Sequence, residues 1–345
     1  MRRRSFVSTT ALATLGSVAS RNALAADKEK PEVAKLATVA PDGTPWSDQL
    51  MQFKGRIEKE SAGKIKLESY LGGALGDENV TAADCKRGAI QLWGGSTGAL
   101  ASLVPEFNLF ELPYLFRNEA EADYVLDEVL LGDVKALLQK RGFEFLFWAE
   151  NGYRNFGTKF GPVKTPAALK GKKMRSQESD VHIAMYKALG ASPVPIAVTE
   201  VLSSLQTGVV DGFDNTPLFT FAASWYQGIK HYTLAEAIYQ PGIVVANKAW
   251  FDKLPGNVKK SIVADQKAEG QRGRKGVREL APDLIANFGA ANIEVHTLTD
   301  AEKDVFAAQC EPTHDAWMKA GGKSAAPMVK KAKAALATFR AKKKS

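Results

Sequence analysis

The sequence predicts an α/β protein of two similar domains with a pocket between them. Its 345 residues correspond to about two domains at roughly 100 to 200 residues each. Strand-length apolar runs alternate with helical patterns, which is typical of βαβ units and a parallel sheet. This alternation restarts near Phe143, and a helical stretch from Asn257 to about Phe288 is long enough to cross both domains.

The first half alternates three expected strands with two expected helices. An apolar run over 33–40 stops at the turn Pro41-Asp42-Gly43, and the helix after it has Ser47 as a candidate N-cap and ends at Gly63. The remaining elements are a strand over 64–71, a helix carrying Cys85, and a strand over 90–93 that runs into the glycine-rich loop 94–98.

The second half repeats the alternation. Its expected elements are a strand over 143–148, a loop over 157–165, an approach to a strand over 169–175, an amphipathic helix over 178–189, a short helix capped by Thr199 and ending at Gly208, and a strand over 209–215.

The N-terminus has the parts of an export signal over residues 1–25. Arg2, Arg3 and Arg4 precede a short, weakly apolar run, and Ala23-Leu24-Ala25 is an A-x-A cleavage site. The arginine pair followed closely by Phe6 resembles signals of the twin-arginine route, and general secretion is the rival. Either route predicts a periplasmic protein.

The basic net charge comes from the two ends of the chain. The formal charge of +8 falls to −3 when the four arginines of residues 1–25 and the seven basic residues of 329–345 are set aside. The body therefore lacks the basic surface that a nucleic-acid partner requires. The basic tail over 329–345 is expected to be a frayed, solvated helix end, with membrane contact as the alternative.

Cys85 and Cys310 are the two cysteines of the chain, and neither belongs to a C-x-x-C pair. In an oxidising periplasm they allow one long-range disulfide, and two separate buried thiols are the alternative.

The sequence motifs for phosphate-binding loops, dinucleotide-binding folds and zinc proteases are also missing, so no cofactor and no metal are expected.

The loop Gly94-Gly95-Ser96-Thr97-Gly98 matches the G-x-S-x-G pattern of a nucleophile elbow. It raises the alternative of a serine hydrolase that uses Ser96. The other interpretation is that these hydroxyl and backbone N–H groups line a binding pocket.

Isolated polar side chains follow the strands of the second half: Arg154 in the NGYRNF stretch, Arg175 after LKGKKM, and Asn215 after VVDGFD. An arginine at a strand end can hold a carboxylate through two parallel hydrogen bonds, which lysine cannot match.

The segment from Leu169 to Asn215 resembles the signature region of DctP-type substrate-binding proteins of tripartite ATP-independent periplasmic (TRAP) transporters. It keeps the L-K-G-x-K-x-R strand, the G-A-x-P-x-P turn, the E-x-x-x-x-L-Q-x-G helix and the V-D-G-x-x-N exit. APDGTPW, YLGGALGDE, ELPYLF and NGYRNF extend the match, in order, over about residues 33–290.

The resemblance implies a two-domain periplasmic-binding-protein-like fold and a receptor, not an enzyme. Such a receptor closes on a small carboxylate by hinge motion and delivers it to the membrane subunits of the importer; a sensor receptor of the same fold is the alternative, and a monomer is expected. The ligand-binding residues that the resemblance implies are Arg175, Arg154, Asn215, Glu78, Trp93, Ser96, Thr97, Phe213 and Asp214.

The domain limits follow from a chain that crosses between the domains more than once. We expect the first domain to contain 26–151 and 240–279, and the second to contain 152–239 and 280–328. Six aromatic residues form either an aromatic cage, which suggests an aromatic or branched monocarboxylate, or part of the core: Trp46, Trp93, Trp148, Tyr153, Phe213 and Tyr239. A second clamp by Arg154 instead suits a dicarboxylate or a hydroxy or keto acid. The predicted ligand class is therefore organic acid.

Overall fold

The computed structural model describes residues 30–320 and 323–342. The expected export signal and the last three residues of the basic tail lie outside the described residues. Contacts between residues group the chain from Pro31 onward into one compact unit. Within the described ranges, no helix is both long and apolar enough to cross a membrane.

One mixed sheet forms the centre of this unit. Its order is β2-β1-β3-β8-β4-β7-β5-β6, with β9 paired to β8. The strands of the described residues are β1 Glu32–Thr38, β2 Ile65–Tyr70, β3 Leu92–Ser96, β4 Phe143–Thr158, β5 Lys173–Ser176, β6 Ser192–Pro195, β7 Gly212–Asn215, β8 His231–Asn247 and β9 Glu294–Thr297.

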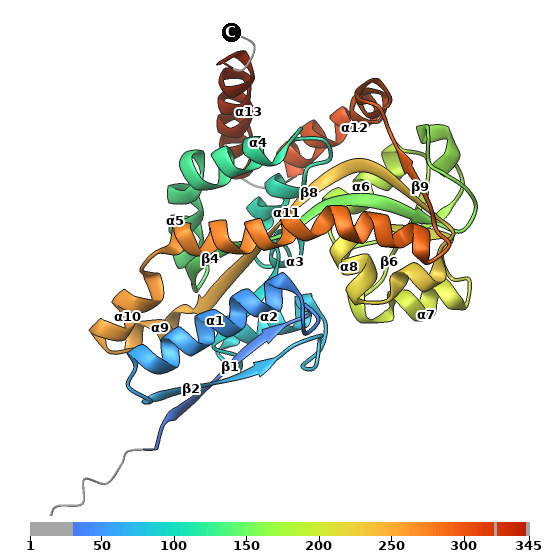
Figure 1. The fold of residues 1–345 in the computed structure, drawn as a ribbon. Helices are drawn as coiled ribbons and strands as arrows, with labels where there is room; N and C mark the ends of the chain where they lie inside the picture. Colours follow the sequence, from blue (N-terminus) through green and yellow to red (C-terminus); the bar gives the residue numbers. More distant parts are fainter. Residues whose placement is uncertain (1–29, 321–322, 343–345) are drawn as a thin grey trace, which may run out of the picture. The chain divides into compact units, whose positions relative to one another are not determined.

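Two long antiparallel strands, β4 and β8, join the two halves of the sheet (Figure 1). We call the half with β1, β2 and β3 lobe I and the half with β5, β6, β7 and β9 lobe II. Parallel pairing holds within β2-β1-β3 and within β6-β5-β7, as expected, but β4 and β8 make the sheet mixed. The β4–β8 register shifts between Glu150 and Gly152 and again between Arg154 and Phe156. The sheet therefore bends where the lobes meet.

Helices cover the sheet of lobe I. They are α1 Pro45–Glu60, α2 Glu78–Arg87, α3 Thr97–Leu100, α4 Glu119–Tyr124 and α5 Leu131–Lys140, with η1 Pro105–Glu111 and η2 Val125–Val129. The predicted cap of α1 was wrong by three residues. Thr44 is the N-cap: its hydroxyl accepts from the Ser47 N–H at 3.2 Å, and Ser47 Oγ accepts from the Thr44 N–H at 3.0 Å. Ser47 is thus the second member of a capping box.

Helices of unequal length surround lobe II. They are α6 Asp180–Ala188, α7 Val201–Gln206, α8 Pro217–Ala222 and α12 Asp300–Ala320, with η3 Pro166–Leu169, η4 Val198–Glu200 and η5 Trp225–Gly228. The expected loop over 157–165 begins too early, because β4 continues to Thr158.

The long helix predicted over 257–288 is two helices. After α9 Lys248–Lys253, α10 Gly256–Val263 ends before Asp265, whose φ of 55° is left-handed, and α11 Gln266–Ala290 follows. α11 packs on β4 and α1 in lobe I and on α8 and β9 in lobe II, so it spans both lobes (Figure 1). At Gly273 an added Cβ would lie 2.2 Å from Gln49 Oε1, so only glycine permits this close approach to α1.

The basic tail is a packed helix and not a solvated charge run. α13 Ala325–Lys342 buries Val329, Ala332 and Leu336 in the hydrophobic cluster of lobe I. Arg340 holds the buried Glu121 through Nε at 2.9 Å and a terminal nitrogen at 2.7 Å. The apolar face of the helix and this bidentate ion pair both attach it to lobe I.

The cysteines are free, so the alternative of two separate buried thiols is correct and the disulfide is not. Cys85 lies in the cluster of lobe I, and Cys310 lies in a different cluster with Phe156 and Phe306. Burial raises the pKa of both thiols. The two side chains occupy separate cores and cannot meet.

Candidate ligand-binding site

A small polar pocket lies between the lobes at the bend of the sheet. About 20 Å³ of it is free, which is room for little more than one water molecule. Lobe I contributes Val39, Trp46, Glu78 and Ser96; lobe II contributes Arg175, Gln177, Val198, Asn215 and Phe219; the connecting strands contribute Asn151, Arg154 and Gln240.

Strand ends place the polar side chains of lobe II. Parallel strands β5 and β7 lie side by side, with Arg175 opposite Phe213. Arg175 and Gln177 are two residues apart along the extended chain and so share a face, and Asn215 is the last residue of β7. The carboxyl ends of neighbouring parallel strands are the usual binding edge of an α/β sheet.

Arg175 is a buried cation that forms no ion pair among the described residues, although the Asp214 and Asp77 carboxylates are near enough to act on its charge. Its Nε and one terminal nitrogen donate to the carbonyl oxygen of Ile196 at 2.9 and 2.7 Å, and its guanidinium lies over the Trp225 ring at 5.3 Å. Burial, together with repulsion from Arg154, lowers the pKa of Arg175 to about 10. The carbonyl and the ring fix the guanidinium, and its charge remains unneutralised by an ion pair.

Arg154, the second expected clamp, has protein partners on every side. Its Nε donates to Asp214 Oδ2 at 2.5 Å, and its terminal nitrogens donate to Gln240 Oε1 at 2.8 Å and to the Asp214 carbonyl. Burial opposes the charged form of Arg154, yet the charge of Asp214 raises its pKa above the usual value. Arg154 lines the pocket as one half of an internal ion pair.

Gln240 is the centre of a network of amide side chains. Its Oε1 accepts from Asn151 at 2.6 Å, and its Nε2 donates to Gln177 Oε1 at 2.9 Å and to Glu111 Oε2 at 2.8 Å. The network therefore joins β4, β8 and the end of β5 below the pocket. The amide side chains of Asn151, Gln177 and Gln240 are the part of this network that lines the pocket without a charge.

Glu78 and Ser96 form the lobe I wall of the pocket. Glu78 accepts from the Ser96 N–H and from Ser96 Oγ, both at 2.9 Å. Burial and the nearby Asp77 raise the pKa of Glu78 to about 7. At neutral pH this wall is therefore only partly charged.

Ser96 does not have the surroundings of a hydrolase nucleophile. Its hydroxyl donates to Glu78, accepts from Gln177 Nε2 at 2.8 Å and caps α3 at the Ala99 N–H. All four histidines are described, and none hydrogen-bonds to Ser96; the buried His182 instead bonds Glu111 at 2.6 Å. The G-x-S-x-G pattern is a helix cap at the cleft.

Four residues of the expected site do not line the pocket. Trp93 is in the core of lobe I, with Nε1 donating to Thr81 at 3.1 Å, and Thr97 donates to the buried Glu111 at 2.7 Å. Phe213 packs edge-on against Trp225 below Arg175, and Asp214 neutralises Arg154. The strands that carry Trp93, Phe213 and Asp214 are buried along their whole length. Thr97 begins the buried helix α3, so all four side chains belong to the core.

Two residues of the lining were missed, Gln177 and Gln240, and a third, Trp46, was expected only as one of six aromatic residues that could form a cage or lie in the core. Gln177 could have been found, because it follows Arg175 by two residues in an extended segment. Gln240 lies within a 17-residue buried strand that has no polar alternation, and its position opposite Gly152 depends on the β4–β8 register. Trp46 is delivered by the first turn of α1, and nothing local in the sequence separates it from a core residue.

The hydrogen bonds that join the two lobes include three beside the pocket. The Val198 N–H donates to Asp77 Oδ1 at 2.8 Å, Asn79 Nδ2 donates to Glu178 Oε2 at 2.9 Å, and Gln177 donates to Ser96. Asp77 is the N-cap residue of α2, yet its side chain makes no capping bond to that helix. Its carboxylate reaches across to lobe II instead.

Comparison with known proteins identifies the family. Residues 36–320 match the model of the DctP family, described as bacterial extracellular solute-binding protein, family 7. The chain is 32% identical over 255 residues to the 2,3-diketo-L-gulonate-binding periplasmic protein YiaO of Escherichia coli. The aligned region covers 74% of this chain and 77% of YiaO.

Two solved structures share the fold. The sugar acid binding protein DctPAm of Advenella mimigardefordensis, in complex with galactonate, is 28% identical with a TM-score of 0.83 over 89% of this chain and 99% of that one. A TRAP periplasmic solute binding protein of Sulfurospirillum deleyianum with bound succinate is 26% identical with a TM-score of 0.81 over 88% and 98%.

The family match, the two-lobe fold and the cleft between the lobes all indicate the same kind of protein. The protein is a solute receptor of the TRAP type, which binds a small organic acid and works with membrane subunits, and it is not an enzyme. The chain belongs to family 7 of the bacterial extracellular solute-binding proteins, the DctP family.

Proposed function

We propose that the transported solute is a hydroxylated monocarboxylate, such as a sugar acid, and that its carboxylate binds Arg175. The observation that carries this proposal is the buried guanidinium of Arg175, which forms no ion pair among the described residues. A buried charge without a counter-charge is costly, so an anion at this position relieves the penalty. Two fixed hydrogen bonds to Ile196 hold the group ready for it.

The pocket has one unpaired cation and therefore suits one carboxylate. Arg154, the other cation of the lining, is already neutralised by Asp214. A second carboxylate on the solute would find no free positive charge and would approach Glu78 and the Asp77 carboxylate. A dicarboxylate is therefore disfavoured.

The rest of the lining suits hydroxyl groups. Ser96, Asn151, Gln177, Asn215 and Gln240 present hydroxyl and amide groups that can both donate and accept. Trp46 also lines the pocket, and its buried indole N–H has no hydrogen-bond partner in the described part of the chain. Polyhydroxy acids satisfy such groups, whereas an aliphatic acid would leave them unpaired.

Binding requires the lobes to open and close. The remaining volume of about 20 Å³ does not admit an acid of several carbons, so the cleft must widen first. We place the hinge at two of the three register shifts of β4 against β8, those between Glu150 and Gly152 and between Arg154 and Phe156. They lie near the limit between the proposed domains 26–151 with 240–279 and 152–239 with 280–328. Contacts made only in the closed form couple solute binding to closure.

The relatives support this choice of solute class in part. YiaO is named for 2,3-diketo-L-gulonate and DctPAm is bound to galactonate, both sugar acids, while the Sulfurospirillum protein is bound to succinate. The family therefore includes both solute classes. The single unpaired arginine of this chain favours the first.

Isothermal titration with four matched solutes tests the proposal. Galactonate has one carboxylate, galactarate has two on the same carbon chain, galactose has none, and succinate has two without hydroxyls. We expect galactonate to bind in this titration. In a separate unfolding experiment, galactonate at a hundredfold excess over Kd should raise the unfolding free energy by about 2.7 kcal/mol. Tighter binding of succinate or galactarate would refute the monocarboxylate assignment and leave the receptor function intact.

We also propose export through the twin-arginine route and a monomeric receptor. Arg3, Arg4 and Phe6 support the export route, and replacing both arginines by lysine should stop export in a host that has this route. Size-exclusion chromatography with light scattering should give the mass of one chain.

A further inference from the structure

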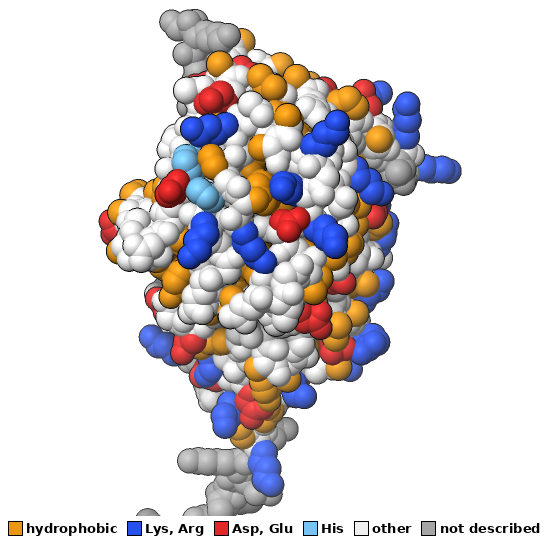
Figure 2. All heavy atoms as spheres, turned by 90° about the vertical axis from the view of Figure 1, so that its right-hand side faces the viewer, with side chains coloured by type: hydrophobic (Ala, Val, Ile, Leu, Met, Phe, Trp, Pro, Cys, Tyr) orange, Lys and Arg blue, Asp and Glu red, His pale blue; other side chains and the backbone are white. Residues whose placement is uncertain are grey.

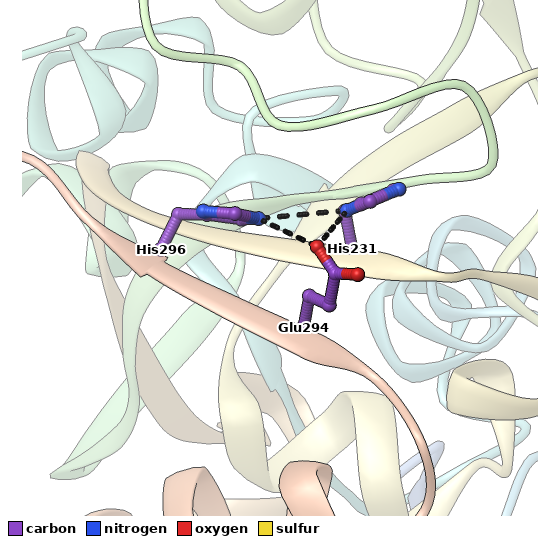
Figure 3. Close-up of side chains that lie close together, drawn as sticks. All are labelled: His231, Glu294 and His296. Atoms are coloured by element: carbon purple, nitrogen blue, oxygen red, sulfur yellow. Dashed lines mark hydrogen bonds and ion pairs between the residues drawn. The ribbon is translucent and has the colours of Figure 1, made fainter.

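Three metal-ligating side chains lie together on lobe II, away from the pocket. β8 begins at His231, and β9 runs parallel to it with His231 opposite Glu294 and Thr233 opposite His296. Side chains alternate along a strand, so Glu294 and His296 share a face, and the register places His231 beside them (Figure 3). Sheet pairing between segments 63 residues apart thus assembles the group.

The separations of the three donor atoms match a tetrahedral zinc site. His231 Nδ1 lies 3.4 Å from Glu294 Oε2 and 3.5 Å from His296 Nε2, and His296 Nε2 lies 3.7 Å from Glu294 Oε2. Bonds of about 2.0 to 2.2 Å to a tetrahedral zinc ion put its ligand atoms roughly 3.3 to 3.6 Å apart. The three atoms are therefore close to three corners of such a tetrahedron before any ion is added.

We propose that His231, Glu294 and His296 bind one Zn²⁺ ion, with water as the fourth ligand. Two imidazoles and one carboxylate are a donor set that zinc accepts and that the harder Mg²⁺ and Ca²⁺ ions do not prefer. The imidazole side chains are about one-fifth exposed and Glu294 is mostly exposed, so an ion can enter from solvent.

The surroundings set a moderate affinity. Lys164 acts electrostatically against a positive charge on His296, and Figure 2 shows two neighbouring imidazoles on this face beside a carboxylate and several basic side chains. No hydrogen bond from a described residue outside the group orients either imidazole. In metal sites, hydrogen-bond partners of the ligating histidines typically raise metal affinity by about 10- to 100-fold. We expect a dissociation constant in the micromolar range.

The chain has one such group among its described residues. The other two histidines are buried and engaged: His182 with Glu111, and His314 with the carbonyl oxygen of Pro113 at 2.7 Å. Zinc binding should therefore have a stoichiometry of one. A bound ion would fasten β9, the strand between α11 and α12, to the start of β8.

Titration of the full chain, free of any histidine tag, with zinc chloride tests the site. We expect one ion per chain, a rise in melting temperature on adding zinc, and no saturable binding of Mg²⁺. His231→Gln and His296→Gln should each weaken binding by more than about tenfold, the double variant should abolish it, and Lys164→Gln should strengthen it. Circular dichroism should show that all variants are folded.

Two results would overturn the site: no saturable zinc binding by the wild type, or binding and stabilisation that persist in the folded double variant. Either result would leave the acid-binding proposal unaffected, because the three residues do not line that pocket.

Discussion

Arg154 and Asp214 form an ion pair in the interior, with Nε 2.5 Å from Oδ2 and neither side chain more than 2% exposed. The hydroxyl of Tyr186 donates to the other carboxylate oxygen of Asp214 at 2.7 Å. The pair removes the charge of Arg154 from the pocket and leaves Arg175 as the cation available to a solute. The proposed ligand class therefore depends on an aspartate that does not line the pocket.

Replacing this aspartate should destabilise the protein strongly. Asp214→Asn leaves Arg154 charged and buried, and breaking a buried pair from one side costs about 3 to 5 kcal/mol. Urea unfolding measures the loss. Asp252→Asn is the matched control, because its pair with Lys248 is exposed and should contribute at most about 1 kcal/mol. Equal effects of the two substitutions would contradict the importance of the buried pair.

Glu78 should make stability depend on pH. Its pKa is raised from 4.5 to about 7 by burial and by Asp77, so the folded protein binds this proton more tightly than the unfolded chain. The resulting stabilisation is complete below about pH 4.5 and is lost as the pH rises to about 7, a change of about 3 kcal/mol. The unfolding free energy of Glu78→Gln minus that of the wild type, both measured by urea unfolding, should increase by this amount from pH 4 to pH 8. A constant difference would show that Glu78 keeps an ordinary pKa.

Asp77 should contribute to closure of the lobes. Its carboxylate accepts from the Val198 N–H across the cleft at 2.8 Å and makes no capping bond to its own helix. Asp77→Ala should weaken galactonate binding by about 5- to 10-fold, since one hydrogen bond contributes about 1 to 1.5 kcal/mol. Asp77→Asn keeps an acceptor oxygen and should bind nearly as well as the wild type. The measurement is calorimetric titration with galactonate. Equal galactonate affinities of Asp77→Ala and Asp77→Asn would count against the role of Asp77 in closure.

The C-terminal helix should be part of the folded core. Leu336 of α13 is 1% exposed, and truncating a buried leucine costs about 2 to 5 kcal/mol, so Leu336→Ala should lower the unfolding free energy by that amount. Lys331→Ala on the same helix removes an exposed ion pair with Asp133 and should change it by less than about 1 kcal/mol. An unchanged denaturation curve for Leu336→Ala would mean that the helix is detached in solution.

Local patterns predicted much of the fold and part of the site. Turn residues and apolar runs located most strands, and the strand-end position of Arg175 pointed to the pocket. The neutralisation of Arg154 could not be predicted, because Asp214 reaches it only through the pairing of β4 with β7, 60 residues away. Pairing of β4 with β8 likewise brought in Gln240.

The wrong assignments have a common physical cause. Trp93 and Phe213 belong to strands that are buried on both faces, where alternation no longer separates a cleft face from a core face. Thr97 begins a short helix that is buried all round. The basic tail was misjudged because its charges concealed an apolar stripe at Val329, Ala332 and Leu336. Both errors concern which face of a strand or helix is buried. A single sequence indicates the buried face only when the opposite face is clearly polar.

The most direct test of the central claim compares galactonate binding by the wild type and by Arg175→Met. Methionine keeps an unbranched side chain over Trp225 and removes the buried charge. We expect the unfolding free energy without solute to be unchanged or higher, because an unpaired buried charge is lost, and galactonate affinity to fall by more than about 30-fold. A folded Arg175→Met protein that binds galactonate as tightly as the wild type would contradict the assignment of Arg175 as the carboxylate-binding residue.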